Sequence, residues 1–156
     1  MKLTSTAFEH EGWIPSKYTA YENNIIPPLS WSEVPEATKS FVLIMDDPDV
    51  PAAMRPTCNC SHWVLFNIPS NVREIKEGES PIGNKGTTTK GNTDYFGPRP
   101  PVDFWPTKHH YYFKLFALNS VLNLKEGATQ QEVEEAMEGK VIEGAVLIGL
   151  YDRTRK

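Results

Sequence analysis

The chain has 156 residues, enough for one domain with a hydrophobic core and too few for two of ordinary size. Its composition of 39% hydrophobic, 11% aromatic and 23% charged residues is typical of a globular protein and not of a disordered one. The formal net charge of −4 argues against nucleic acid as a partner, and no segment approaches the roughly 20 apolar residues that span a bilayer, so residues 1–156 are expected to form one soluble domain without stable membrane insertion.

The order of apolar and turn-forming residues favours a mainly β fold. Thirteen prolines and ten glycines separate short apolar runs, as in an antiparallel sandwich or barrel. Prolines in the opening third limit any strands there to short or edge positions. Four later runs predict strands: residues 40–46 (SFVLIMD), 62–68 (HWVLFNI), 110–118 (HYYFKLFAL) and 141–152 (VIEGAVLIGLYD). The first two are continuously apolar at their centres, which is typical of central strands covered on both faces.

Two further segments are defined by their polar residues. Residues 77–101 form a long connection rich in Gly and Thr that ends in a proline cluster, and a connection of this length is usually functional or mobile. One helix is predicted after Thr129, which forms a capping box with Glu132, and Gly139 is placed to end it.

Polar side chains stand at the ends of the predicted strands, where a rigid sheet presents a binding site. Residues two apart in a strand share a face, so His109 and Tyr111 point to the same side as the apolar Phe113, while His110 points to the other. If the face of Phe113 is the core face, then His109 and Tyr111 mark its rim. Their ring nitrogen and hydroxyl are then expected to converge on a small cavity.

Two other segments supply candidate partners for these side chains. His62 opens a strand, whereas Asp47 and Asp49 end one, with Pro48 holding the turn. His and Tyr are donors suited to an anionic oxygen, and free backbone N–H groups around Gly97 are expected to add more. A carboxylate repels a phosphate, so it needs a different role. It either fixes a histidine as imidazolium whose second nitrogen donates to the anion, or receives the ammonium of a zwitterionic ligand.

The two cysteines favour a reducing environment. Cys58 and Cys60 are so close that a disulfide between them closes only with strain, and no apolar signal segment follows Met1, so a cytoplasmic location is expected. An enzymatic alternative takes both cysteines, with His62 and His109, as metal ligands or as the Cys-His pair of a hydrolase. Zinc sites, however, prefer pairs spaced as C-x₂₋₄-C, which this sequence lacks.

Several motifs occur in order along nearly the whole chain: DPDVP (47–51), HWVLFNIP (62–69), GPRPP (97–101), HHYYFKLFAL (109–118) and GLYDR (149–153). Together they resemble the phosphatidylethanolamine-binding protein family, also called the Raf kinase inhibitor-like family, in its bacterial and archaeal branch. The resemblance implies a two-sheet antiparallel β-sandwich with Greek-key connections, a few short peripheral helices and an anion pocket near one end of the larger sheet. With Asp49 added from the same turn, the expected ligand-binding residues are Asp47, Pro48, Asp49, His62, Gly97, Pro100, His109 and Tyr111.

The resemblance also implies a cis peptide bond at Asp47–Pro48. The sequence departs from the family pattern at His110, where the family has Arg, and at Val50, where it has Ala; neither exchange should remove the pocket. The link VDFWPTK between Pro101 and His109 is longer and bulkier than the family's, so Trp105 or Phe104 is a candidate to cover part of the pocket.

The function that the resemblance implies is binding without catalysis. The expected ligand is a small anion or phosphate-bearing molecule such as a phosphoethanolamine-like head group, with neither cofactor nor metal. Members of the family also act on protein kinases or proteases, so regulation of such a partner is the main alternative.

Overall fold

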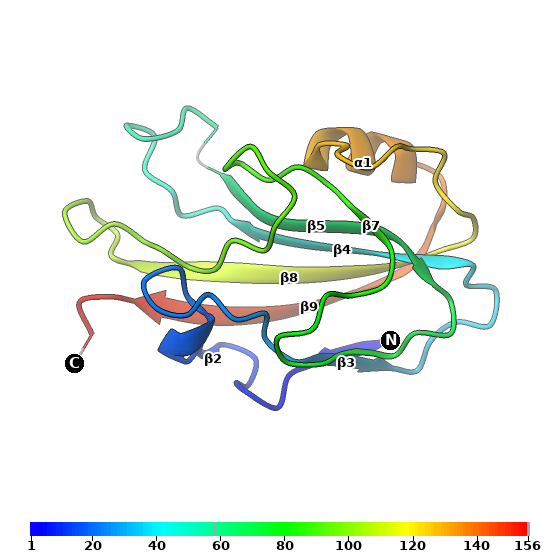
Figure 1. The fold of residues 1–156 in the computed structure, drawn as a ribbon, viewed down its shortest axis with the longest axis horizontal. Coiled ribbons are helices and arrows are strands. Elements are labelled where there is room, and N and C mark those ends of the chain that lie inside the picture. The colour runs from blue at the N-terminus through cyan, green and yellow to red at the C-terminus, as the bar shows by residue number, and fades with distance from the viewer. Residues whose placement is uncertain (58, 156) are drawn as a thin grey trace.

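The computed structural model describes residues 1–57 and 59–155 and has a mainly β fold, with two sheets and one α-helix in these residues (Figure 1). The elements are β1 (Lys2–Thr4), β2 (Gly12–Trp13), the 3₁₀ turn η1 (Ser16–Tyr18), β3 (Leu29–Ser32), β4 (Ser40–Asp47), β5 (Cys60–Pro69), β6 (Glu74–Ile75), β7 (Asn84–Lys85), β8 (Lys108–Leu118), α1 (Gln130–Met137) and β9 (Val141–Asp152). The large sheet has the order β2-β9-β8-β4-β5-β7, and the small sheet has the order β1-β3-β6. In the described part of the chain, no helix is long and apolar enough to cross a membrane.

The four strands predicted from the apolar runs form the centre of the large sheet. They pair antiparallel, as the sequence predicts, and the structure gives their order as β9, β8, β4 and β5. One pairing differs from the expected antiparallel arrangement, because β2 runs parallel to the end of β9. β2 has only two residues, too few for an apolar alternation to be recognised in the sequence.

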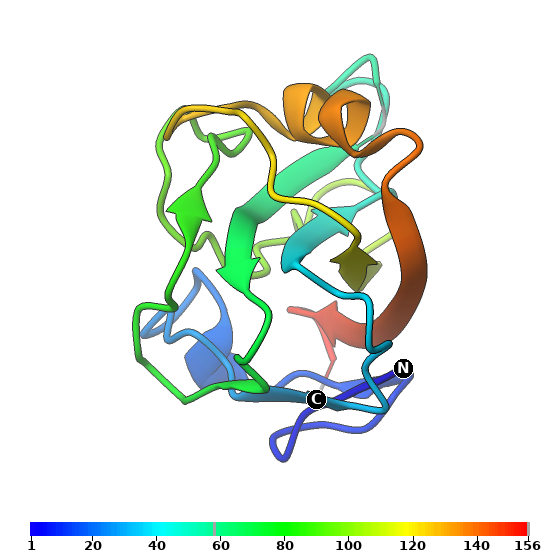
Figure 2. The same ribbon diagram turned by 90° about the vertical axis from the view of Figure 1, so that its right-hand side faces the viewer.

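Both faces of the central strands are covered, which explains their continuous apolar sequence. Leu43 and Met45 of β4 face a core shared with the small sheet, whereas Val42 and Ile44 face a second core beneath α1. Figure 2 shows α1 on one side of the large sheet and the small sheet on the other. Alternate residues of one strand therefore belong to two cores, and each position needs an apolar side chain.

Helix α1 has the ends that its sequence predicts. The Thr129 side chain accepts a hydrogen bond from the Glu132 backbone N–H, and the Glu132 side chain accepts one from the Thr129 backbone, so the capping box is complete. Gly139 has a φ of 75°, the left-handed conformation that commonly follows a helix. Val133 and Met137 are buried against the sheet.

The antiparallel register brings the polar strand ends together. Asp47 at the end of β4 pairs with Cys60 at the start of β5, and Lys108 at the start of β8 pairs with Asp152 at the end of β9. All four positions lie at the end of the large sheet that is on the left in Figure 1. This end carries the candidate site.

Candidate functional site

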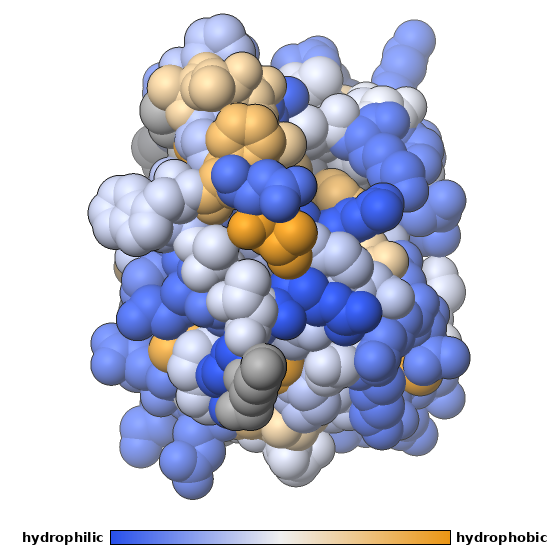
Figure 3. Space-filling view, turned by 90° about the vertical axis from the view of Figure 1, so that its left-hand side faces the viewer, coloured by the Kyte–Doolittle hydropathy of each residue, from blue (hydrophilic) through white to orange (hydrophobic). Residues whose placement is uncertain are grey.

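A cavity of about 270 Å³ opens at this end of the large sheet. Its walls are largely apolar, with polar groups only from a few side chains, as is usual for a small-molecule site. It is lined by Asp47, Val50, Met54, Arg55, Cys60, His62, Thr89, Phe96, Arg99, Pro100, Pro101 and His109. Figure 3 views the molecule from this end and shows hydrophobic side chains gathered within a mostly hydrophilic surface. The volume lies just below the usual range for ligand pockets, roughly 300–1,000 Å³, and so suits a small group.

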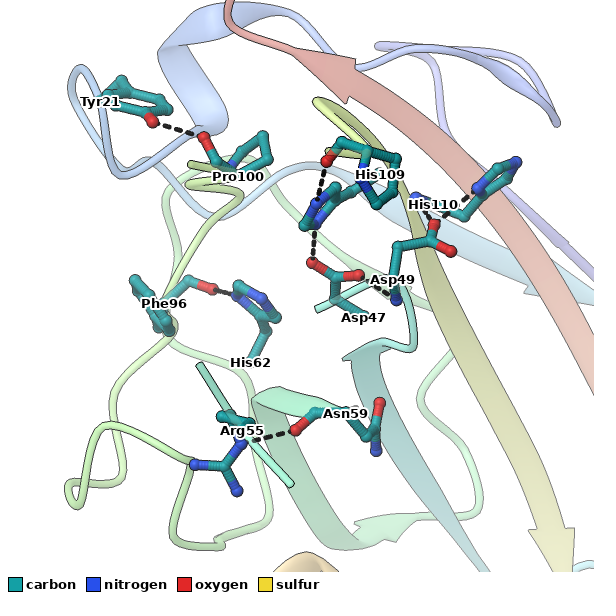
Figure 4. Close-up of polar contacts among 11 residues, drawn as sticks. Tyr21, Asp47, Asp49, Arg55, Asn59, His62, Phe96, Pro100, His109 and His110 are labelled. Atoms are coloured by element: carbon teal, nitrogen blue, oxygen red, sulfur yellow. Dashed lines mark hydrogen bonds and ion pairs between the residues drawn. The ribbon is translucent and has the colours of Figure 1, made fainter. Parts of the chain in front are cut away.

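A buried ion pair forms one wall of the cavity. The Nδ1 of His109 lies 2.6 Å from Oδ2 of Asp47, and its Nε2 lies 2.9 Å from the carbonyl oxygen of Pro106 (Figure 4). Both oxygens can only accept hydrogen bonds, so both ring nitrogens must carry a proton and His109 is an imidazolium. Burial opposes this charge, but the hydrogen bond and the negative charge of Asp47 outweigh it and raise the pKa of His109.

This geometry changes the role expected for the pair. The sequence left the second nitrogen of the histidine free to donate to an anion, but the Pro106 carbonyl occupies it. The other oxygen of Asp47 accepts the backbone N–H of Asp49 at 2.8 Å, so both carboxylate oxygens already hold a donor. Of the two roles considered for the carboxylate, the structure favours fixing the imidazolium over receiving a ligand ammonium.

His62 has the opposite protonation. Its Nδ1 lies 2.5 Å from the carbonyl oxygen of Phe96, and the imidazole stacks on the Phe96 ring with 4.6 Å between the centroids. Burial is the largest influence and lowers the pKa of His62, so the ring is neutral near pH 7. The proton belongs on Nδ1, because this atom faces a carbonyl. Nε2 is left as an acceptor with no hydrogen-bond partner among the described residues.

Tyr111 lies behind the two histidines and does not line the cavity. Its ring centroid is 5.3 Å from that of His62 and 6.4 Å from that of His109. The hydroxyl is buried and has no hydrogen-bond partner within the described ranges. Burial, and secondarily the charge of Asp47, raise the pKa of Tyr111 well above its ordinary value. The side chain is therefore a neutral phenol beside the ion pair.

The alternation along β8 is confirmed, since His109, Tyr111 and Phe113 are buried and His110 is only partly so. His110 forms a separate pair with Asp49: its Nδ1 and its backbone nitrogen each lie 2.7 Å from Oδ2 of that carboxylate. Asp49 thus belongs to the opposite face of the strand and does not line the cavity.

The surrounding loops differ at three points from the arrangement that the sequence suggested. Pro48 is exposed and is not among the residues that line the cavity. Among the described peptide bonds the cis bond is Trp105–Pro106 and not Asp47–Pro48. Trp105 is 88% exposed and, like Phe104, does not line the cavity. The long link acts on the site in another way, by directing the Pro106 carbonyl at His109.

Gly97 allows two segments to pack closely, and its backbone N–H is not free to bind a ligand. Its backbone N–H donates to Oδ1 of Asn24 at 2.7 Å, so the expectation of a free N–H at this position is wrong. A Cβ atom at position 97 would lie 2.2 Å from the carbonyl oxygen of Tyr18, too close for any residue but glycine. The glycine lets the 95–101 segment pack against the turn that follows η1.

Two arginines that line the cavity were not predicted from the sequence. Arg55 comes from the turn after β4, and Arg99 comes from the GPRPP motif, which was identified only for its backbone. Nε of Arg55 donates to the carbonyl oxygen of Asn59 at 2.7 Å, which leaves its terminal nitrogens available. The sequence offered two signals for them. Arg99 stands between prolines in GPRPP, and Arg55 lies in the turn that begins with the carboxylates.

The enzymatic alternative gains no support from Cys60. Burial is the largest influence and raises the pKa of the Cys60 thiol, which opposes formation of the nucleophilic thiolate. Cys58 lies outside the described residues. In residues 1–57 and 59–155 there is no group of three or more His, Cys, Asp and Glu side chains arranged to hold a metal ion.

The two buried histidines should give stability opposite pH dependences. Neutral His62 stabilises the fold above its unfolded pKa of about 6.5, and this contribution is lost as the pH falls. Charged His109 contributes fully below about 6.5 and loses its contribution as the pH rises through its raised folded pKa. Urea unfolding from about pH 5 to pH 9 should show the advantage of wild type over His62→Gln growing with pH, and that over His109→Gln shrinking. Parallel profiles of the three proteins would contradict both assignments.

The fold and site define a class of protein: a mainly β domain with a small cavity at the strand ends of its larger sheet. The sequence profile of the phosphatidylethanolamine-binding protein family matches residues 4–152. Proteins designated UPF0098 from Methanothermobacter thermautotrophicus and Chlamydia trachomatis are 45% and 41% identical, and each alignment covers 98% of this chain and 99% of the relative. The chain belongs to the phosphatidylethanolamine-binding protein family.

Solved structures agree with this assignment. A crystal structure of a phosphatidylethanolamine-binding protein homologue from Chlamydia trachomatis has a TM-score of 0.92 and 41% identity, with 97% of each chain covered. Escherichia coli YbcL, described as a new member of the mammalian family, has a TM-score of 0.85 and 25% identity over 97% of each chain. Family membership therefore confirms the resemblance found in the sequence motifs.

Proposed function

We propose that the protein binds a small anionic, phosphate-bearing ligand in the cavity and acts by binding and not by turnover. One observation carries the proposal: Arg55 and Arg99 line the cavity, and neither has a carboxylate partner among the residues that the structure describes. Guanidinium groups with free N–H edges match the geometry of phosphate oxygens.

The charge balance of the cavity supports an anion despite Asp47. The carboxylate is neutralised by the His109 imidazolium at 2.6 Å, and His62 is neutral, so the two arginines supply the remaining charge. Partial removal from water by the apolar walls strengthens their attraction for an anion. The pair of Asp47 and His109 then serves as a positioning element that holds the ends of β4 and β8 together.

His62 gives the proposed binding a pH dependence. Its bare Nε2 can accept a hydrogen bond from a protonated phosphate oxygen, or take up a proton and donate to an ionised one. A bound anion favours the imidazolium and so raises the pKa of His62 from its lowered value in the free protein. Affinity is therefore expected to increase as the pH falls toward about 6.

Titration with inorganic phosphate and with phosphorylethanolamine, followed by the ring resonances of His62, tests the proposal. We expect a saturable shift in the millimolar range, larger toward about pH 6. Arg55→Gln or Arg99→Gln should each weaken binding about tenfold, or about 1.4 kcal/mol. Arg73→Gln is the matched control, because Arg73 is exposed, does not line the cavity and donates to the carbonyl oxygens of Ser70 and Val72. Absence of any shift at millimolar phosphate would end the proposal.

A protein partner regulated through the same cavity is a second candidate, favoured by the apolar side chains around the opening. Met54, Val102, Phe104 and Trp105 are all exposed on the two loops that border it. Exposed hydrophobic groups beside a binding site are typical of a macromolecular interface. In this case ligand binding should change the environment of these exposed side chains. The indole resonance of Trp105, assigned with Trp105→Phe, should then shift together with the ring resonances of His62 in the same phosphate titration.

A further inference from the structure

The arginines of this protein share an unusual feature. None of the seven ion pairs in the described residues involves an arginine: each positive partner is a lysine, a histidine or the N-terminus. In a chain with a net charge of −4, guanidinium groups have many carboxylates available, so their lack of partners requires another explanation. Two of them, Arg153 and Arg155, line a second cavity that the proposed function does not use.

The second cavity lies where the end of β9 meets the segment after β2. It has a volume of about 330 Å³ and is lined by Trp13, Ile14, Pro15, Ser16, Tyr151, Asp152, Arg153 and Arg155. It shares no lining residue with the first cavity. Its polar surface comes from guanidinium, hydroxyl and carboxylate groups, whereas the first cavity is bounded mainly by apolar side chains.

Aromatic rings hold both guanidinium groups in place. The guanidinium carbon of Arg155 is 4.0 Å from the ring centroid of Trp13, and that of Arg153 is 4.7 Å from the centroid of Tyr21. Such an interaction uses the face of the guanidinium and leaves its N–H edge free to donate. It also restricts the side-chain rotamers before a ligand arrives, which lowers the entropy lost on binding.

The one carboxylate that lines the cavity is already satisfied by other donors. Oδ1 of Asp152 accepts the backbone N–H and the hydroxyl of Thr154, and Oδ2 accepts the hydroxyl of Thr107. Burial acts against ionisation, but these hydrogen bonds outweigh it and lower the pKa of Asp152. Two arginines against one aspartate leave a net charge of +1 among the residues that line the cavity.

A chain of contacts joins this cavity to the first one. The Tyr21 ring lies tilted against the Tyr151 ring with 6.4 Å between centroids, and the Tyr21 hydroxyl donates to the Pro100 carbonyl at 2.5 Å. Arg99 of the first cavity lies over the same Tyr21 ring, with its guanidinium carbon 5.7 Å from the centroid. The Tyr21 ring therefore contacts an arginine of each cavity, and Figure 4 shows the contact of Tyr21 with Pro100 at the edge of the first site.

We propose that Arg153 and Arg155, with Trp13 and Tyr151, form a second anion-binding subsite that accepts a phosphate group, either free or as a monoester. The guanidinium edges bind the phosphate oxygens, and the Trp13 ring holds the Arg155 guanidinium in place. The hydroxyls of Ser16 and Tyr151 are 3.1 Å apart, so one of them keeps a proton available for a further hydrogen bond to the ligand. This subsite does not depend on the function proposed for the first cavity.

The test adds phenyl phosphate or inorganic phosphate to the full chain. Binding is followed by the indole N–H resonance of Trp13 and the Nε–H resonances of Arg153 and Arg155. The Trp13 resonance is assigned with Trp13→Phe. We expect a saturable millimolar shift at all three positions with either probe. Arg153→Gln combined with Arg155→Gln should weaken the Trp13 response about tenfold or more. These residues are exposed, so the double variant should keep the thermal stability of the wild type.

Two of these variants separate this subsite from the first cavity. Arg55→Gln should reduce the His62 response to phosphate and leave the Trp13 response intact. Arg153→Gln combined with Arg155→Gln should reduce the Trp13 response and leave the His62 response intact. If phosphate fails to shift His62 but still shifts Trp13, the proposed function falls and the second subsite stands. Absence of a saturable response at Trp13, or one that persists unchanged in the double variant, would overturn the subsite.

Discussion

Replacing Asp47 with asparagine is expected to lower the free energy of unfolding by about 3–5 kcal/mol at about pH 6, because it breaks a buried ion pair while leaving the charged partner in place. The side chains of His109 and Asp47 are only 1% and 3% exposed. Without the carboxylate, His109 must either remain charged in a site with little water or lose a proton. The neutral ring carries one N–H only and can no longer donate to both the side chain of residue 47 and the Pro106 carbonyl.

The protein contains its own control for this prediction. Asp49 and His110 form a pair of the same chemistry, at 2.7 Å and from the same two segments, but their side chains are 29% and 40% exposed. Asp49→Asn should therefore cost no more than about 1 kcal/mol. Urea unfolding of both single variants, combined with His109→Gln and His110→Gln in two double-mutant cycles, measures each coupling energy. Equal coupling energies in the two cycles would contradict the role assigned to burial.

The contrast between these pairs shows how far the sequence determined the site. The period of two along β8 assigned His109 and His110 to opposite faces, and the apolar residues that follow identified which face is buried. The antiparallel register then required the ends of β4, β5 and β8 to meet at one end of the sheet. Strand faces and strand ends follow from local periodicity, so the approximate position of the site and several of its side chains were predictable.

Contacts made by loop backbones were not predictable in the same way. The carbonyl of Pro106 meets His109 because of the path of the 101–108 link, and that path depends on packing and not on any local pattern. The same holds for the N–H of Gly97, which was expected to be free for a ligand and which Asn24 occupies through a contact 73 residues away in the chain. For similar reasons the arginines were missed: whether a guanidinium finds a carboxylate depends on neighbours that only the fold brings together.

Gly97 is where a loop contact should have a large effect. In Gly97→Ala the new Cβ would lie 2.2 Å from the Tyr18 carbonyl oxygen and 2.8 Å from Oδ1 of Asn24. The first of these atoms belongs to the backbone and cannot rotate away, so the 95–101 segment must shift. Forcing an extra methyl group into a packed site typically costs about 1–3 kcal/mol, and we expect a loss of unfolding free energy in this range.

The same substitution should also disturb the cavity. Gly97 follows Phe96, whose carbonyl oxygen accepts the hydrogen bond from Nδ1 of His62, so a shift of this segment lengthens that contact and alters the protonation of the ring. Gly97→Ala is therefore expected to change the His62 ring resonances in the free protein and to weaken phosphate binding. Gly144→Ala in β9 is the matched control, because its Cβ would meet nothing closer than a Phe116 ring carbon at 3.4 Å. A Gly97→Ala protein with wild-type stability and unchanged His62 resonances would mean that the contact between this segment and the turn after η1 does not support the site.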